Sequence, residues 1–529
     1  MPRVERRYAF LLAVLVVAVL AVLLADRRGG TAPPAVAVPA KAKRAVRSPP
    51  RVELGNRVIV VLRTRSLADR VAAAGGPVSA ARERAWTQAV LAAQHRLLAR
   101  LARRGVTLRP EASFVRVLDG FSSAAGPGTV PLIEQDRDVA GVYPVRAAEP
   151  VPPGRAAATP RLTGADGYGV TIALLDTGVD AGDPSLRGRI LDGIDLTGAP
   201  PAPVERYGTE AARRLVGAAG AAPGAAVLPI RVAAAQQDGH GGRVVYARTD
   251  QVIAGLERAV DPNDDGDAHD AVRVALVPLT VPLAAFADAP ERRAVAGALA
   301  LGTLVVTPPG PEGAGAVLTA GAAAVLAQVR PTLDAAALRG LLAGTARHGR
   351  IDLPAAAAAE IAPGSAVDGV TTLTNVSTRP VALALSSGGA SILLPRGATI
   401  RVRSSAGTVI HVAGGGAIRI PGLVRPRPAR PLGTVTLSPR GGARLRAVLE
   451  IRASAPLARL DVRLERADAA KSVLVARMRD LVPGRYALGL TGRDPMGHLL
   501  APGDYVVSVV ATPVEGGSRT LRKLRLALR

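Results

Sequence analysis

The sequence predicts an α/β domain with a mostly parallel sheet, preceded by a small α+β domain and followed by β-sandwich-like C-terminal domains. Between residues 161 and 361, apolar segments of strand length alternate with helical stretches, which is typical of a parallel sheet covered by helices on both faces. Residues 57–149 show a strand–helix–strand–strand–helix–strand order. From residue 362 onward, short alternating apolar runs between Gly, Pro, Ser and Asn turns indicate antiparallel strands.

Length and composition restrict the class of protein. At 529 residues the chain is too long for one hydrophobic core, so several domains are expected. The net charge is +25 and comes mainly from Arg. These Arg are scattered and lack aromatic partners for base stacking, so we do not expect nucleic-acid binding. The chain has no Cys, which excludes a disulfide framework and thiol chemistry.

The N-terminus carries a targeting segment. Tyr8–Ala25 is an unbroken apolar run flanked by Arg, long for a cleaved signal and long enough for a membrane span. Residues 1–28 are therefore predicted to be a signal peptide or a signal-anchor helix, with a late cleavage site at residues 35–37 as the alternative to an anchor. Residues 29–56 are rich in Pro, Ala and Gly and predict a disordered linker. Either outcome implies export, with the body membrane-anchored or secreted.

The predicted α+β domain begins with a strand at Arg57–Leu62. Apolar residues near a 3.6-residue spacing predict a helix over Ala80–Arg104. A second strand is expected at Phe114–Leu118, ended by an Asp-Gly turn signal. A short helix at Val130–Gln135 and a last strand at residues 141–144 complete the domain.

Two segments resemble those of one enzyme family. Residues 169–180, GVTIALLDTGVD, form an apolar strand that ends in Asp-Thr-Gly and resembles the aspartate motif of the subtilases, the subtilisin-like serine proteases. The stretch SFVRVLDGFSS, followed by QDRDVAGVYPV, resembles their inhibitory propeptide. The resemblance implies a subtilase propeptide-like domain at 57–149, a subtilisin-like domain at 161–361 and the catalytic acid at Asp176.

Tyr207 stands where the resembled family carries its catalytic histidine. Residues 206–210 read RYGTE in place of a His-Gly-Thr-His motif. A serine hydroxyl becomes a nucleophile only when a neighbouring imidazole takes its proton and a carboxylate orients that imidazole. A phenol, with an ordinary pKa of about 10, is no base near pH 7. The histidines of this domain, none of them in the position of the base, are His240, His269 and His348.

The positions of the oxyanion donor and the nucleophile also depart from the resembled pattern. Pro311 falls where the family places an Asn, and proline offers neither a side-chain donor nor a backbone N–H. Gly313 stands approximately where the serine belongs, and no serine occurs between Ser185 and Ser365. Thr319 would need a base that the sequence does not supply. The subtilisin-like domain is therefore expected to be degenerate and internally shortened.

An acidic loop follows a predicted helix in the same domain. Oxygen ligands at alternating positions with a Gly for the sharp turn are typical of the first half of a calcium loop, but the bidentate Glu that normally ends it is missing. The loop leaves two interpretations open, calcium ligation and a solvated acidic turn. Its candidate ligands are Asp261, Asn263, Asp265, Asp267 and Asp270.

The C-terminal part is predicted to form a β domain at 362–424 and a fibronectin type III or Ig-like β domain at 432–529. The second resembles such sandwiches in its segment GRYALGLTGRDPMGHLLAPGDYVVSVVATP.

The functional hypothesis is an exported subtilisin-like serine peptidase homologue that is catalytically inactive and acts in binding or regulation. It would have a peptide or protein partner, a membrane contact through the N-terminal apolar segment and no required cofactor. The alternatives are a structural or adhesive surface protein acting through its C-terminal β domains, a serine-type endopeptidase with a non-standard active site, and a decaying gene without function.

Overall fold

The computed structural model describes most of the chain from residue 56 onward. The described residues are 56–126, 128–152, 159–237, 242–280, 289–308, 314–347, 350–364, 370–385, 391–403, 409–412, 416–420, 433–440, 446–466, 472–490, 492–494, 498–514 and 519–528. Among them no helix is both long and apolar enough to cross a membrane. The predicted targeting segment at 1–28 and nearly all of the predicted linker at 29–56 lie outside the described residues.

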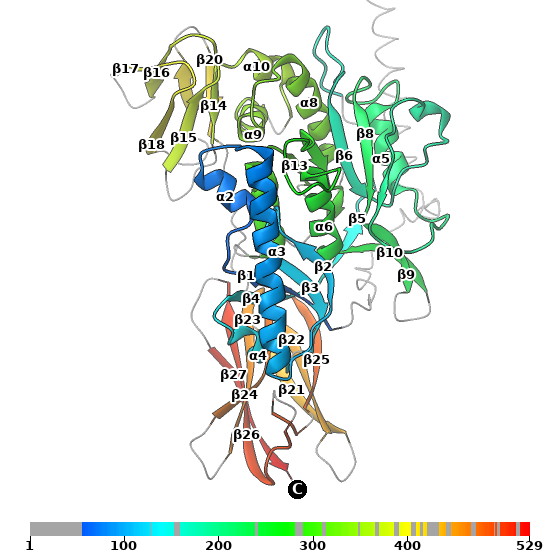
Figure 1. Ribbon diagram of the computed structural model, residues 1–529, viewed down its shortest axis with the longest axis vertical. Helices are drawn as coiled ribbons and strands as arrows, with labels where there is room; N and C mark the ends of the chain where they lie inside the picture. Colours follow the sequence, from blue (N-terminus) through cyan, green and yellow to red (C-terminus); the bar gives the residue numbers. More distant parts are fainter. Residues whose placement is uncertain are drawn as a thin grey trace, which may run out of the picture. The chain divides into compact units, whose positions relative to one another are not determined.

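The N-terminal region is an antiparallel sheet in the order β2-β3-β1-β4, with the long helix α3 lying across it (Figure 1). Alternate residues of β1 serve two cores. Val58, Val60 and Leu62 pack with the α3 residues Leu97 and Leu101 on one face. The elements of this region are β1 Arg57–Leu62, α2 Leu67–Ala73, α3 Ala80–Arg103, β2 Pro110–Phe114, β3 Gly120–Ala124, α4 Val130–Glu134 and β4 Val139–Pro144.

The predicted strand at Phe114–Leu118 is wrong. In the structure β2 ends at Phe114 and β3 begins at Gly120. The backbone N–H groups of Val115, Arg116 and Val117 donate to the carboxylate of Glu257 instead of to a neighbouring strand. A carboxylate from elsewhere in the chain therefore replaces the strand ladder for these residues.

The α/β region has a five-stranded sheet in the order β13-β11-β6-β8-β7, all of its pairs parallel. The predicted fold class is confirmed by this sheet, by the antiparallel α+β region before it and by the antiparallel sheets after it. The elements, in chain order, are β6 Thr171–Asp176, a short 3-10 helix Pro184–Leu186, β7 Ile194–Asp195, α5 Tyr207–Val216, β8 Ala226–Arg231, α6 Thr249–Val260, β11 Val274–Leu276, α7 Pro290–Ala300, β13 Leu304–Val306, α8 Ala314–Val329, α9 Ala335–Gly344 and α10 Leu353–Ala358.

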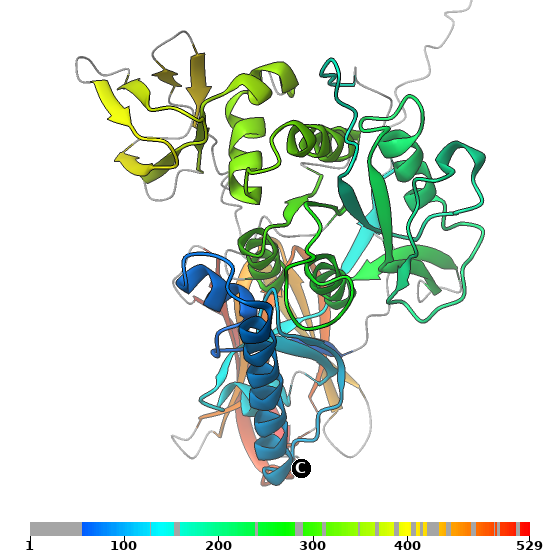
Figure 2. The same ribbon diagram turned by 45° about the horizontal axis from the view of Figure 1, so that its top comes forward.

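Helices cover both faces of the parallel sheet. Ile172 and Leu174 of β6 point into a core built with α5, α8 and α9. Ala173 and Leu175 point into a second core with α6 and α7, and β1 contributes its other face to this second core. Figure 2 shows α6 and α7 on the side of the sheet that faces the N-terminal region. The N-terminal and α/β regions therefore share one hydrophobic core.

Antiparallel strands make up the C-terminal part, as predicted. Strands β14–β20 form a three-stranded and a four-stranded sheet around one core. Strands β21–β27 form another three-stranded and four-stranded pair of sheets around a separate core, and this pair is a β-sandwich. Their bounds are β14 Ile361–Pro363, β15 Val370–Asn375, β16 Val381–Leu385, β17 Ser391–Leu394, β18 Thr399–Arg403, β19 Val409–Val412, β20 Gly416–Arg419, β21 Gly433–Arg440, β22 Arg446–Ala453, β23 Leu457–Arg466, β24 Ser472–Leu481, β25 Gly484–Leu490, β26 Gly503–Pro513 and β27 Arg519–Leu528.

Candidate functional site

Asp176 ends the central strand of the parallel sheet. In open α/β sheets, ligand sites form beyond the carboxyl ends of the strands, and Asp176 lies at that end of β6, between β8 and β11. Its side chain is buried, with 1% of its surface exposed. The carboxylate Oδ1 accepts the backbone N–H of Thr177 at 2.7 Å.

The loop that follows Asp176 and residues 206–210, where the resembled family carries its histidine, meet in space. The backbone N–H of Gly208 donates to the Thr177 hydroxyl at 3.0 Å, and the N–H of Asp180 donates to the Thr209 hydroxyl at 2.9 Å. Helix α5 approaches so closely that a Cβ at Gly208 would lie 2.1 Å from the carbonyl oxygen of Gly178. The start of α5 is thus packed directly on the loop that follows Asp176.

Burial sets the protonation of Asp176. Desolvation raises its pKa to about 7, against the backbone and hydroxyl hydrogen bonds of Thr177, and the nearby carboxylate of Glu210 raises it further. Desolvation favours the neutral form of a carboxyl group that has no cation beside it. Asp176 is therefore largely protonated below neutral pH.

The other predicted catalytic positions supply no base or nucleophile among the described residues. Tyr207 is the half-buried first residue of α5. Thr319 lies in α8 and donates its hydroxyl hydrogen to the carbonyl of Gly315, one turn earlier in the same helix. Four predicted or considered positions lie outside the described residues, and they are Pro311, Gly313, His240 and His348.

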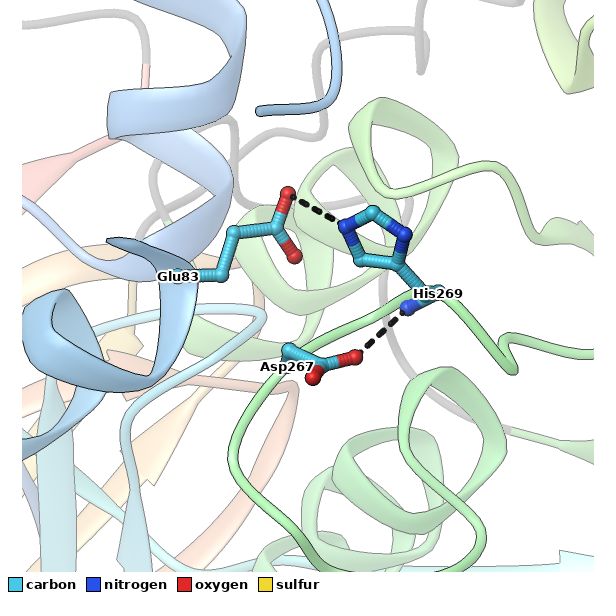
Figure 3. A group of neighbouring side chains, drawn as sticks. All are labelled: Glu83, Asp267 and His269. Atoms are coloured by element: carbon cyan, nitrogen blue, oxygen red, sulfur yellow. Dashed lines mark hydrogen bonds and ion pairs between the residues drawn. The ribbon is translucent and has the colours of Figure 1, made fainter. Parts of the chain in front are cut away.

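His269 is held at the interface with the N-terminal region (Figure 3). Its Nε2 lies 2.8 Å from the carbonyl oxygen of Val78 and 3.6 Å from Oε1 of Glu83 on α3. Its backbone N–H donates to Asp267. A carbonyl oxygen only accepts hydrogen bonds, so Nε2 carries a hydrogen and is unavailable as a metal ligand. Although Glu83, Asp267 and His269 bring ligand atoms within 4.8 Å of one another, the histidine is used as a hydrogen-bond donor.

The acidic loop accepts hydrogen bonds from side chains of the N-terminal region. Arg84 of α3 donates to Asp267 at 2.5 Å, and the Thr87 hydroxyl donates to the carbonyl of Gly266 at 2.7 Å. Arg116 reaches into the loop from the segment between β2 and β3. Its guanidinium donates to the fully buried Asp261 and, at 2.7 Å, to Asp264.

In this arrangement the carboxylates of the acidic loop are engaged by arginine side chains and by backbone N–H groups. Calcium needs carboxylate and carbonyl oxygens that converge on the cation. Here the carboxylate of Asp261 accepts from Arg116 and from the backbone N–H groups of Asp265 and Gly266, while Asp267 faces Arg84. Asn263 and Asp270 also accept or donate within the loop. The interpretation as a solvated turn is wrong for Asp261 and Asp267, which are buried, and the arginine side chains supply the positive charge.

Glu257 of α6 is the second acceptor for the N-terminal region. Its fully buried carboxylate accepts the backbone N–H groups of Val115, Arg116 and Val117 at 2.7–3.0 Å. Desolvation raises the pKa of Glu257 although Arg116 and these hydrogen bonds act to lower it. On α7, a Cβ at Gly297 would lie 1.9 Å from the Val117 carbonyl oxygen, so this close approach requires a glycine.

A short strand after the N-terminal sheet is inserted between two strands of the α/β region. Strand β5, Ala147–Pro150, pairs antiparallel with β10, Arg243–Arg248, and with β12, Leu279–Thr280. Strand β9, Ala233–Gln237, extends this four-stranded sheet beyond β10. We call the position between β10 and β12 the strand slot. Ala148, at its centre, is fully buried.

The residues that hold the N-terminal region in place could not be recognised from the sequence. Glu257 lies in an ordinary amphipathic helix, and Arg116 lies in a segment that reads as a strand. Ala147–Pro150 has no strand signal, because alanine, glutamate and proline are depleted in strands. A local signal existed only for the acidic loop, whose carboxylates required a positively charged partner.

Comparisons with known proteins return structural likeness alone. No family model and no curated protein matches the chain. Among solved structures the chain is similar to fervidolysin from Fervidobacterium pennivorans, described as a keratinolytic enzyme related to subtilisin, with a TM-score of 0.39, 14% identity and 86% of each chain covered. It is also similar to a protease from Pseudoalteromonas arctica, with a TM-score of 0.29, 16% identity and coverage of 37% of this chain and 91% of that one.

Replacing Asp176 by Asn should stabilise the protein at neutral and higher pH. The folded pKa of about 7 lies above the unfolded value, so wild-type stability is highest below the unfolded pKa and falls as the pH rises through 7. The penalty above pH 7 is roughly 4 kcal/mol. The denaturation midpoint of Asp176→Asn should therefore exceed that of the wild type at pH 8 and match it near pH 4.

Asp195, at the end of β7, offers a control with the opposite sign. Desolvation raises its pKa, but hydrogen bonds from Thr197 and Arg231 hold the pKa below its usual range. Asp195→Asn should cost stability at pH 8 and lose that effect as the pH falls. Equal midpoints for Asp176→Asn and wild type at pH 8 would show that Asp176 is not neutralised by burial.

Replacing Arg116 by Met should destabilise the protein, because Glu257 and Asp261 would become buried carboxylates without their cation, a change that costs about 3–5 kcal/mol. Arg258→Met is the control, since Arg258 pairs with the exposed Asp264 within the α/β region.

Millimolar calcium added to chelator-treated wild-type protein should leave the thermal midpoint unchanged. A calcium-dependent increase in that midpoint would contradict the arginine interpretation of the loop.

Proposed function

We propose that this chain is an exported homologue of the subtilisin-like serine peptidases that lacks peptidase activity and binds an extended peptide or protein segment. The N-terminal apolar run supports export, with the body anchored to the membrane or released. The absence of serine between Ser185 and Ser365 and the substitution at Tyr207 support the loss of activity. His269, the histidine described in this domain, is engaged at the interface with Glu83 and Val78.

The observation that carries the binding proposal is the strand slot. Strands β10 and β12 each present backbone groups to β5, which completes the sheet between them. An extended segment that adds to a free sheet edge gains main-chain hydrogen bonds and places alternate side chains in pockets. The chain's own residues 147–150 occupy the position that such a segment would take. A partner would bind there by displacing β5.

If the chain is not cleaved after the N-terminal region, β5 remains in the strand slot. Hydrolysis after the N-terminal region would require an activated nucleophile, which the residues at the predicted catalytic positions, Tyr207, Pro311 and Gly313, do not offer. The N-terminal region and β5 would then stay covalently attached and at high effective concentration. A partner must compete with a tethered strand, so the affinity of the slot for other segments depends on how firmly β5 is held.

A structural or adhesive role remains the alternative. The β21–β27 sandwich has its own core, which is the observation that favours it. Binding that maps to this sandwich and persists when the strand slot is altered would support the alternative over the slot.

The purified full-length chain should show no serine-hydrolase activity. A fluorophosphonate probe should not label it, and no new N-terminus should arise near residue 150. Tyr207→His should leave both results unchanged, because the base alone does not restore a nucleophile. An active subtilisin at equal concentration is the positive control. Labelling that disappears in Asp176→Ala would overturn the proposal and favour the endopeptidase with a non-standard active site.

Opening the strand slot should create a binding site for an extended peptide. Ala148→Asp introduces a carboxylate at a fully buried position and should expel β5, because burying an unpaired charge is strongly unfavourable. A labelled peptide with the sequence of residues 145–151, VRAAEPV, should then bind the variant but not the wild type. Fluorescence anisotropy measures this, with a scrambled peptide as the control. Equal binding to both proteins, or none to the variant, would count against the slot.

A further inference from the structure

The segment that leads into the strand slot is also held by the C-terminal β-sandwich. Arg146 directly precedes β5, and its side chain is buried. Its guanidinium donates to both carboxylate oxygens of Glu291 on α7, at 2.8 and 2.7 Å. It also donates to the backbone carbonyl of Asp480, in β24 of the sandwich, at 3.2 Å. One side chain therefore joins β5 to the α/β region and to the sandwich.

A second contact joins the sandwich to the N-terminal sheet. Glu134 at the end of α4 has a side chain that is 7% exposed. Its two carboxylate oxygens accept from Arg477 at 2.6 Å and from Arg479 at 2.5 Å, both on β24. The guanidinium of Arg479 also lies 5.8 Å from the ring centre of Tyr143 in β4. A buried carboxylate between two guanidiniums is a charge-assisted contact with a fixed geometry.

The sandwich residue that meets Arg146 has an unusual backbone. Asp480 has φ of 50°, a left-handed conformation that non-glycine residues rarely adopt. Its side chain is buried, and its carboxylate lies 3.9 Å from Arg146. Such conformations persist only where the surrounding structure requires them, and they cluster at functional positions. Here this conformation occurs at Asp480, whose carbonyl oxygen accepts a hydrogen bond from the Arg146 guanidinium.

We propose that the C-terminal sandwich is a clamp that holds β5 in the strand slot, acting through Arg146 and through the contact of Glu134 with Arg477 and Arg479. The clamp regulates the site described under the proposed function and rests on that proposal for its biological meaning. Release of the sandwich from α4 frees the N-terminal sheet and the Arg146 end of β5 together. A ligand that binds the sandwich would thereby control access to the slot.

The test measures hydrogen exchange of the backbone amides of residues 146–149 and 151 in the full-length chain, since Pro150 has no N–H. Arg479→Met removes one guanidinium from Glu134 without touching Arg477, which also pairs with Asp461 inside the sandwich. Glu134→Gln weakens the same contact from the other side and leaves the sandwich unchanged. Each variant should speed exchange of these amides by about tenfold or more, because local opening becomes easier. Arg463→Met, an exposed position on β23, should have no effect.

Exchange and peptide binding separate the clamp from the slot. Faster exchange at residues 146–149 and 151 in both variants supports the clamp even when the peptide VRAAEPV fails to bind, a result that counts against the proposed function alone. Unchanged exchange in both variants overturns the clamp, even when Ala148→Asp binds the peptide and the slot proposal stands. Exchange that also increases throughout β23 and β26 in Arg479→Met but not in Glu134→Gln marks unfolding of the sandwich, and the Glu134→Gln result then decides.

Discussion

The carboxylate of Glu257 is the contact on which the placement of the N-terminal region depends. It accepts three consecutive backbone N–H groups from residues 115–117, and Arg116, in the middle of that segment, carries the balancing charge toward Asp261. A buried carboxylate is costly unless its lone pairs are satisfied and a cation is near. Neither side can therefore leave without exposing an unpaired charge or three orphaned donors. The shared apolar core behind it adds hydrophobic stabilisation to this polar contact.

The docked N-terminal region places β5 in the strand slot. Strand β5 follows β4 after only two residues, so it reaches the slot with little freedom once the N-terminal sheet is fixed. The slot is filled by a strand with small side chains, which gains more from backbone pairing than from side-chain burial. Its retention therefore depends on the contacts at its ends. Arg146, with partners in the α/β region and in the sandwich, is the contact at the end nearer β4.

The packing around Asp176 is held by hydroxyl and backbone hydrogen bonds. The loop after Asp176 and the start of α5 are held together by Thr177, Gly208 and Thr209, and none of these contacts needs an imidazole. A carboxyl group without a nearby cation becomes neutral when it is buried, which is consistent with the raised pKa of Asp176. The scaffold can persist because its stability comes from glycine packing and hydroxyl hydrogen bonds, and these are separable from the chemistry of a peptidase.

The sequence by itself determined the layers of the fold, and it raised the expectation of departures at the catalytic positions of the resembled family. Hydrophobic periodicity is local, so β6 and α3 could be predicted within a few residues, and the antiparallel class of the C-terminal strands could be predicted as well. Tyr207 and the serine-free stretch could be recognised because motif spacing is also local. Only the tertiary structure decided that Phe114–Leu118 is no strand, that the acidic loop receives Arg84 and Arg116, and that Ala147–Pro150 forms a strand. Each of these depends on a partner far away in the sequence, such as Glu257 for Arg116, and no local pattern encodes which distant group will satisfy a buried charge or a free sheet edge.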